Sequence, residues 1–293
     1  MKYKDPEAFR TALEARLRQP SDAVGDLSRR RRTVAFDRLL ARLAVAGHDA
    51  WLLKGGAALE FRMPERARAT RDVDLALTDG HDPADLLLDD LADDPFDDWF
   101  SFRVTRRREL SEAPDRGAVI RLSMDAAIGG RTFERFVVDI ATGHDVPGTT
   151  ERVELGRLLG FAGIPVVKMA VIDLRTHWAE KLSAYLRRYD DRPNTRFKDL
   201  VDLVLLIENG LEPDDRLRLA VETTFTRRGQ PLPGPDLPSM ADAWAVTFAG
   251  MATELDLVTA VAADAHTLVE DFWRRALSTG DAPRGADAPR HTN

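Results

Sequence analysis

The stretch from Leu52 to Leu77 reads LLKGGAALEFRMPERARATRDVDLAL, and it predicts both the fold and the chemistry of this chain. A short apolar run leads into the glycines Gly55 and Gly56, and a basic loop then leads into an alternating segment that begins DVDL. Because residues i and i+2 of a strand point to the same face, Asp72 and Asp74 are expected to project together while their apolar neighbours enter the core.

Two neighbouring carboxylates repel each other unless a cation lies between them. Oxygen ligands suit Mg²⁺ or Mn²⁺, ions that commonly accompany nucleotide phosphates. Gly55 and Gly56 let backbone N–H groups approach an anion closely, at a turn into a helix that starts near Ala57. A diglycine alone is usually a tight turn, and a D-x-D segment alone is often a solvated face. Their close succession predicts a nucleotide-phosphate site with a divalent metal.

Two further motifs carry a resemblance to a known family. The stretch above resembles the first motif of the DNA polymerase β-like nucleotidyltransferase superfamily, in the form found in the AbiEii/AbiGii toxin family. Members of that family carry a lysine in an E/Q-K-L-x-A context, which residues 180–184 (EKLSA) match. They then carry R-x-K/H-D-L-x-D-L, which residues 196–203 (RFKDLVDL) match. The C-terminal remainder is most similar to the mycobacterial MenT-type tRNA nucleotidyltransferase toxins.

The resemblance implies an enzyme and names its residues. Asp72, Asp74, Lys181 and Asp202 match the catalytic positions, and Asp139 is a possible third acid beside the metal ligands Asp72 and Asp74. The implied cofactor is Mg²⁺ or Mn²⁺, and the implied substrate is an NTP. The enzyme would transfer NMP to the 3′ end of tRNA and release pyrophosphate, which blocks aminoacylation and translation. The chain would then be the toxin of a type IV-like toxin–antitoxin system, opposed by a cognate antitoxin encoded nearby.

Several of these residues also have ordinary structural interpretations. Asp139 lies in the apolar segment VVDI, where an acid is costly unless it binds a metal or pairs with an arginine. Lys181 lies beside an apolar helical stripe, so it either reaches the triphosphate or extends past the stripe into solvent. Lys54 either binds phosphate or is an exposed lysine at a strand end. The residues predicted to contact the nucleotide are Lys54, Gly55, Gly56, Thr70, Arg71, Arg196 and Asp199, although Asp199 could be only a helix-face partner of Arg196.

Composition agrees with a cytoplasmic enzyme, and we expect a monomer. The chain has 293 residues and no cysteine, which excludes disulfides and thiolate metal sites. No apolar run is long enough to span a bilayer, and the N-terminus lacks the apolar core of a signal peptide. The net charge is −7, yet arginines gather in clusters such as Arg29 to Arg32 and Arg106 to Arg108. Such clusters could hold RNA phosphates or could be solvated faces.

The hydrophobic pattern predicts an α/β nucleotidyltransferase domain over residues 1–165, with a mixed sheet flanked by helices. An all-α domain over 166–278 would contribute Lys181 and Asp202 to a cleft between the two, and 279–293 would be a disordered tail. The expected helices are 5–18, 27–47, 57–62, 83–92, 166–174, 176–189, 196–208, 214–227, 240–251 and 255–277. The expected strands are 51–53, 72–77, 100–104, 119–124 and 133–140, with a hairpin turn at Gly129 and Gly130.

Three other functions remain compatible with the sequence. A small-molecule nucleotidyltransferase of the antibiotic-modifying kind shares the first motif, and a protein-modifying nucleotidyltransferase would label polypeptide instead of RNA. A catalytically silent nucleotide-binding or partner-binding module is the third alternative. The intact set of repelling carboxylates disfavours it, because a silent copy has no physical reason to keep them.

Overall fold

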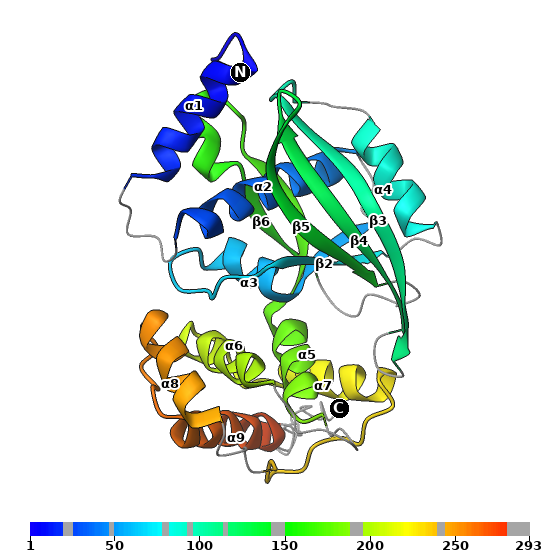
Figure 1. Ribbon diagram of the computed structural model, residues 1–293. Coiled ribbons are helices and arrows are strands. Elements are labelled where there is room, and N and C mark those ends of the chain that lie inside the picture. The colour runs from blue at the N-terminus through cyan, green and yellow to red at the C-terminus, as the bar shows by residue number, and fades with distance from the viewer. Residues whose placement is uncertain are drawn as a thin grey trace, which may run out of the picture.

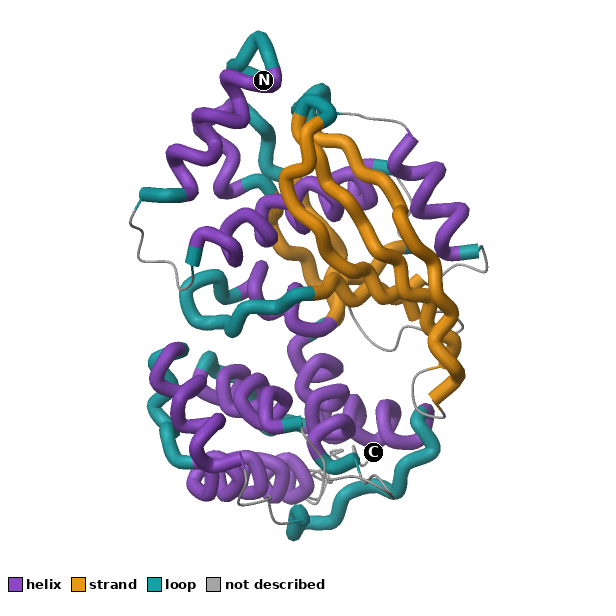
Figure 2. Tube along the Cα trace, viewed as in Figure 1, coloured by secondary structure: helices purple, strands orange, loops and turns teal. Residues whose placement is uncertain are grey.

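The computed structural model describes residues 1–19, 26–46, 50–77, 82–92, 96–113, 117–141, 150–187, 196–238 and 244–279. The strands gather in one part of the molecule, and helices α5 to α9 gather in the other (Figures 1 and 2). The helices are α1 (Pro6–Leu17), α2 (Leu27–Val45), α3 (Gly55–Arg62), α4 (Pro83–Ala92), α5 (Leu174–Tyr185), α6 (Phe197–Glu208), α7 (Asp215–Arg227), α8 (Ala245–Glu254) and α9 (Ala262–Thr279). The strands are β1 (Trp51–Lys54), β2 (Asp72–Leu77), β3 (Phe100–Ala113), β4 (Gly117–Ile128), β5 (Arg131–Ala141), β6 (Thr150–Leu155) and β7 (Val167–Ile172), and a 3₁₀ helix, η1, spans Arg157–Ala162.

The sheet is mixed and has seven strands in the order β3-β4-β5-β2-β1-β7-β6. Strand β2 pairs antiparallel with β1 and parallel with β5, so the D-x-D strand lies in the interior of the sheet. The long hairpin of β3 and β4 forms one side, and β7 with β6 forms the other. The mixed α/β class predicted from the sequence is therefore confirmed.

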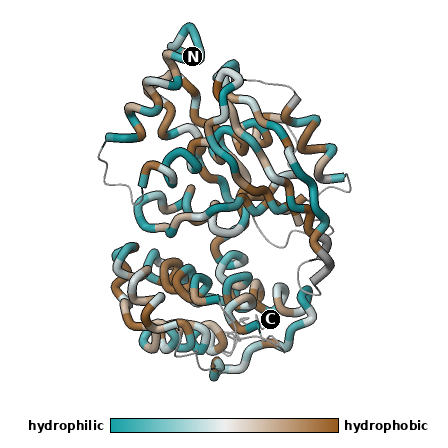
Figure 3. Tube along the Cα trace, viewed as in Figure 1, coloured by the Kyte–Doolittle hydropathy of each residue, from teal (hydrophilic) through white to brown (hydrophobic). Residues whose placement is uncertain are grey.

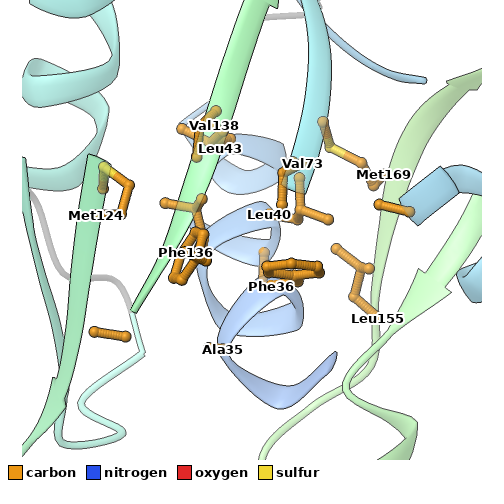
Figure 4. Packing of buried hydrophobic residues seen from close by; sticks show 14 of the residues in the cluster. Ala35, Phe36, Leu40, Leu43, Val73, Met124, Phe136, Val138, Leu155 and Met169 are labelled. Atoms are coloured by element: carbon orange, nitrogen blue, oxygen red, sulfur yellow. The ribbon is translucent and has the colours of Figure 1, made fainter. Parts of the chain in front are cut away.

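Helix α2 covers one face of the sheet and forms its core. In Figure 4, Phe36 and Leu40 of α2 lie against Phe136 and Val138 of β5 and against Val73 of β2. The Phe36 and Phe136 rings meet edge to face with centroids 5.1 Å apart. Because side chains alternate along each strand, burying these apolar residues turns the intervening polar residues of β2 and β5 to the opposite face.

Helices α5 to α9 surround a second apolar cluster, which includes Trp178, Leu203 and Phe272. Helix α6 is apolar over most of its length and appears largely brown in Figure 3. Two residues from the sheet part, Leu59 of α3 and Ala67 of the following loop, belong to the same cluster. This shared burial fixes α3 and its loop against the helices that carry the other motifs.

Several sequence predictions are confirmed closely. Residues 72–77 form β2 and residues 83–92 form α4, with the predicted bounds. The hairpin turn at Gly129 and Gly130 joins β4 to β5, and both glycines have positive φ values of 56° and 78°. The strands β3, β4 and β5 are longer than predicted, and β6 was not predicted.

One predicted helix is wrong, and another begins later than predicted. Residues 166–174 were predicted as a helix, but β7 occupies Val167–Ile172 and pairs with β1 and β6. The segment is apolar almost throughout, and its β-branched residues favour a strand that is buried in a sheet. The helix predicted over 255–277 begins only at Ala262. Asp256 has a φ of 51°, and the Glu208 carboxylate accepts hydrogen bonds from the backbone N–H groups of Val258 and Thr259, which holds this segment out of a helix.

The helical pattern therefore begins after Ile172 and not after Pro165. The division into an α/β domain and an all-α domain stays a prediction. Of the predicted tail, Thr279 is the last residue of α9, and residues 280–293 lie outside the described residues. Within the described ranges, no helix has both the length and the apolar character needed to cross a membrane.

Candidate active site

The predicted acids meet in one row across the sheet. Register pairs Lys54 of β1 with Asp74 of β2, Asp74 with Asp139 of β5, and Asp139 with Arg121 of β4. Directly paired residues on neighbouring strands project from the same face. Asp72 lies two residues before Asp74 and shares that face, which is the one opposite α2. The sheet thus brings together residues from four separate segments of the chain.

The diglycine turn lies directly against this row. Gly55 has a φ of 60°, and a Cβ placed on it would lie only 1.9 Å from Asp74 Oδ2. A Cβ on Gly56 would lie 2.8 Å from the hydroxyl oxygen of Thr70. Only glycine therefore allows the backbone to run this close to the acid strand. Helix α3 starts at Gly55, and its N-cap residue, Lys54, makes no side-chain capping hydrogen bond. This arrangement suits an anion at the start of the helix.

Asp74 has an unusual electrostatic environment. Burial, with repulsion from Asp72 and Asp139, raises the pKa of Asp74 from 3.8 to about 6, and the nearby ammonium groups of Lys181 and Lys54 only partly offset the rise. The Thr70 hydroxyl donates to Asp72 Oδ1 over 3.0 Å and so positions that carboxylate. The nucleotide contact predicted for Thr70 stays a prediction, and in the structure its hydroxyl is a partner of Asp72.

Asp139 is held by an arginine. Arg121 Nε donates to Asp139 Oδ1 over 2.7 Å, and Arg121 Nη2 donates to Oδ2 over 2.6 Å. This two-point contact holds the carboxylate in plane with the guanidinium group. From the sequence, Asp139 was expected either to bind a metal or to pair with an arginine. The arginine pair exists, and Asp139 also lies next to Asp74 in register, on the interior strand β5.

Lys181 and Asp202, from the two downstream motifs, form a buried network. Lys181 Nζ lies 2.7 Å from Asp202 Oδ2 and 3.1 Å from Asp199 Oδ1. Arg68, from the loop before β2, contacts the Asp202 carboxylate through Nε at 2.9 Å and Nη2 at 2.8 Å. Burial alone would raise the pKa of Asp202, but Arg68 and Lys181 outweigh it and lower that pKa to about 2. Likewise, burial disfavours the charge on Lys181, but Asp202 and Asp199 raise its pKa.

Lys54 is paired and is not an isolated strand-end lysine. Its Nζ lies 2.7 Å from Glu180 Oε1 on α5. Arg227 and Arg228, at the end of α7, approach the same oxygen at 3.3 and 3.7 Å. Burial would raise the pKa of Glu180, but Lys54 and the arginines overcome it and lower that pKa to about 2. Cationic groups therefore gather around a single carboxylate beside the acid row.

Two predicted nucleotide contacts lie less centrally. Arg71 is exposed and lies immediately before β2. Arg196 precedes α6, and its guanidinium lies 3.7 Å from Asp199, through which it reaches Lys181.

Sequence reasoning missed the pairing roles of Arg68, Arg121 and Glu180. Glu180 precedes Lys181 in the second motif, and Arg68 lies in the basic loop, so both residues belong to stretches that the sequence analysis singled out. Their roles were missed because their partners lie far away in the chain.

The donor set suits a divalent cation at Asp72 and Asp74. These carboxylates share a face, repel each other, and lie against a glycine that leaves room beside Asp74. Asp139 fits less directly, because Arg121 already binds both of its oxygens. In the described part of the chain, no cluster of three or more His, Asp or Glu side chains has the geometry of a complete metal site. Mg²⁺ usually takes its remaining ligands from substrate phosphates and water.

Comparisons with known proteins agree with the motifs. The model of one protein family, described as nucleotidyl transferase AbiEii toxin of the type IV toxin–antitoxin system, matches residues 38–277. No curated protein matches. The crystal structure of JHP933 from Helicobacter pylori is 12% identical with a TM-score of 0.44, over 86% of this chain and 96% of that one. A putative nucleotidyltransferase from H. pylori is 12% identical with a TM-score of 0.43, over 87% and 96%. The two structural likenesses are too distant to support an assignment.

Proposed function

We propose a specific reaction from one established premise: the chain belongs to the family of AbiEii nucleotidyl transferase toxins of type IV toxin–antitoxin systems. We propose that it transfers NMP from an NTP to the 3′ end of tRNA, in a reaction that depends on Mg²⁺ or Mn²⁺. The modified tRNA could no longer be aminoacylated, and translation would stop. The tRNA acceptor rests on the resemblance to the MenT-type toxins. Membership in a toxin–antitoxin family implies a cognate antitoxin.

The observation that carries the proposal is the contact between the diglycine turn and the acid row. Asp72 and Asp74 would hold the divalent ion beside Gly55, where the start of α3 can receive phosphate oxygens. A bound Mg²⁺ would supply charge neutralisation at the phosphates and alignment of the acceptor hydroxyl. Lys181 is kept charged by Asp199 and Asp202 and would neutralise the leaving pyrophosphate.

In this reaction the acceptor hydroxyl oxygen forms a bond to the α-phosphorus. The bond from the α-phosphorus to the oxygen that bridges to the β-phosphorus breaks, and pyrophosphate leaves. We assign the hydroxyl proton to Asp139, which neighbours Asp74 in register. Each Asp139 oxygen accepts one N–H from Arg121 and keeps a further lone pair for that proton.

The test is label transfer with purified protein, α-labelled NTPs, Mg²⁺ and total tRNA. We expect label on tRNA with the native chain and a loss of at least about 100-fold with Asp72→Asn or Asp74→Asn. A matched control is Asp271→Asn, because Asp271 is an exposed residue of α9 that pairs with Arg274 and lies outside the acid row. Transfer that is absent, or that is equal in the native chain and both site variants, contradicts the tRNA proposal. Label on protein or on an aminoglycoside would instead favour one of the other acceptors.

A further inference from the structure

The face of the sheet that carries the acid row continues outward over β4 and β3. Along one line, Asp139 pairs with Arg121, and Arg121 pairs with Arg108 of β3. Along the next line, Ser123 of β4 pairs with Arg106 of β3. Side chains at paired positions project from one face. The arginines beyond the acids therefore extend the same surface away from Asp72 and Asp74.

A third line of this surface adds two more arginines. Arg103 of β3 pairs in register with Asp125 of β4, which pairs with Arg135 of β5. Asp125 lies between them, 3.0 Å from Arg103 and 3.3 Å from Arg135. We call the set of Arg103, Arg106, Arg108, Arg121 and Arg135 the arginine face.

The arginine face is open to solvent. The side chains of Arg103 and Arg135 are 75% and 74% exposed, and that of Arg121 is 40% exposed while it holds Asp139. Arg106 and Arg108 are also exposed. Helices α2 and α4 contact the sheet from the other side, through core residues such as Phe36 and Leu87. The hairpin β3–β4, which carries most of this face, projects at the side of the molecule in Figure 1.

The positive charge of this surface is opposite in sign to the net charge of the whole chain. The protein has a formal net charge of −7. Over β3, β4 and β5, the three register lines carry five guanidinium groups and two carboxylates, Asp125 and Asp139, both of which are paired with arginines. The first two lines then continue to Asp74 and Asp72 on β2. The intervening positions of β4 and β5 are small or neutral, such as Ser123 and Val137. Within the described ranges, the arginines found over aromatic rings are others than these five. Arginines of this kind suit contact with phosphates more than reading of bases.

We propose that the arginine face is the docking surface for the phosphate backbone of the RNA whose 3′ end enters the acid row. This inference rests on the proposed function, which makes RNA the acceptor. Strands lie 4.7–4.9 Å apart, so β3 is about 10 Å from β5, and the five-residue span from Arg103 to Arg108 adds about 17 Å along the strand. A surface of that size contacts several consecutive phosphates. Arg121 belongs to both the acid row and the arginine face, because it binds Asp139 and its side chain is still partly exposed.

The test compares the double variant Arg106→Gln/Arg108→Gln with the native chain. Both residues lie on β3, two strands away from Asp139 of β5. Arg107 lies on the same strand but on the opposite face, where it pairs with Asp82, and Arg157 is exposed on η1. The double variant Arg107→Gln/Arg157→Gln therefore removes the same charge from outside the arginine face and is the matched control. The probe is total tRNA, and affinity is measured over a range of salt concentrations.

Removal of two phosphate contacts is expected to make the negative slope of log K for tRNA binding against log salt shallower, by about 1.4 for single-stranded contacts. The KM for tRNA in label transfer should rise about tenfold or more, while the KM for NTP stays constant. The control variant should behave as the native chain. Circular dichroism of both variants checks that the fold is retained.

Equal tRNA affinity and equal salt slope in the native chain and the Arg106/Arg108 variant would overturn the inference. Normal tRNA binding with lost neutralisation by the antitoxin would also overturn it, because the face would then belong to a protein partner. Failure of the proposed function has a different signature. The native chain would transfer no label to tRNA, and the binding experiment would still report on the arginine face.

Discussion

Replacement of Asp74 by asparagine is expected to stabilise the metal-free protein. In the native chain, burial and the charges of Asp72 and Asp139 raise the pKa of Asp74 from 3.8 to about 6. A carboxyl whose pKa is raised by folding costs stability wherever it is ionised in the folded protein. A difference of this size corresponds to roughly 3 kcal/mol, and partial accessibility of the side chain reduces it to roughly 2 kcal/mol. Asp74→Asn removes this cost.

The gain should depend on pH in a defined direction. The folded protein binds the Asp74 proton more tightly than the unfolded chain, so native stability falls as pH rises from 3.8 to 6 and stays lower above that. The advantage of Asp74→Asn should therefore be complete at pH 8. It should fall to about half at pH 5 and to below about 1 kcal/mol at pH 4.

Urea unfolding in EDTA at several pH values measures this difference. Asp125→Asn is the control, because loss of a surface ion pair should cost up to about 1 kcal/mol and so has the opposite sign. Added Mg²⁺ should narrow the gap at pH 8, since a ligand at 100 times its Kd stabilises the native chain by about 2.7 kcal/mol. An Asp74→Asn protein that is no more stable than the native chain at pH 8, or whose gain is the same at pH 4, refutes the electrostatic account.

Three further substitutions test the rest of the site. Gly55→Ala places a methyl group 1.9 Å from a carboxylate oxygen of Asp74, at a φ of 60°, and should reduce NMP transfer at least about 100-fold. The control Gly130→Ala also has a positive φ, of 78°, but its methyl group would have no atom within 4 Å, so transfer should stay intact. Similar activities of the two variants would contradict the close approach of Gly55 to Asp74. Arg68→Ala leaves Asp202 buried with less positive charge and should lower the urea unfolding free energy by about 3 kcal/mol, with partial recovery in Arg68→Lys; an unchanged midpoint would argue against the network. Lys181→Met should slow single-turnover transfer by about 10²- to 10³-fold, and a rate near that of the native chain would remove Lys181 from the mechanism.

The parts of the fold that local sequence encodes were predictable. Strand β2 alternates acids with apolar residues, and this period of two fixes both its type and the shared face of Asp72 and Asp74. The close approach of Gly55 follows from glycine's lack of a Cβ. Strand β7 was predicted wrongly because it is apolar almost throughout, and a short apolar run fits a buried helix as well as a buried strand.

The partners of the charged residues were not predictable, because they depend on long-range pairing. Arg68 and Asp202 are 134 residues apart, and their contact requires the loop before β2 to lie against α6. The arginine that binds Asp139 is set by the register of β4 on β5, which no pattern within either strand encodes. The sequence could therefore name the candidate acids but could not distinguish Asp202, whose charge Arg68 and Lys181 compensate, from Asp74, where burial and repulsion outweigh the nearby lysines.

That distinction predicts separate roles for the acids. Asp74 and Asp202 are the same residue type and both lie in the candidate site, yet the pKa of Asp74 is about 6 and that of Asp202 is about 2. Asp202 has two cationic partners in Arg68 and Lys181, so an added metal ion would gain little there. Asp74 lies between like charges, so a divalent cation relieves the most repulsion beside it. Environments that give two carboxyl groups different pKa values suit them to different tasks. The difference favours Asp74 as the metal ligand and Asp202 as the residue that keeps Lys181 charged and in place.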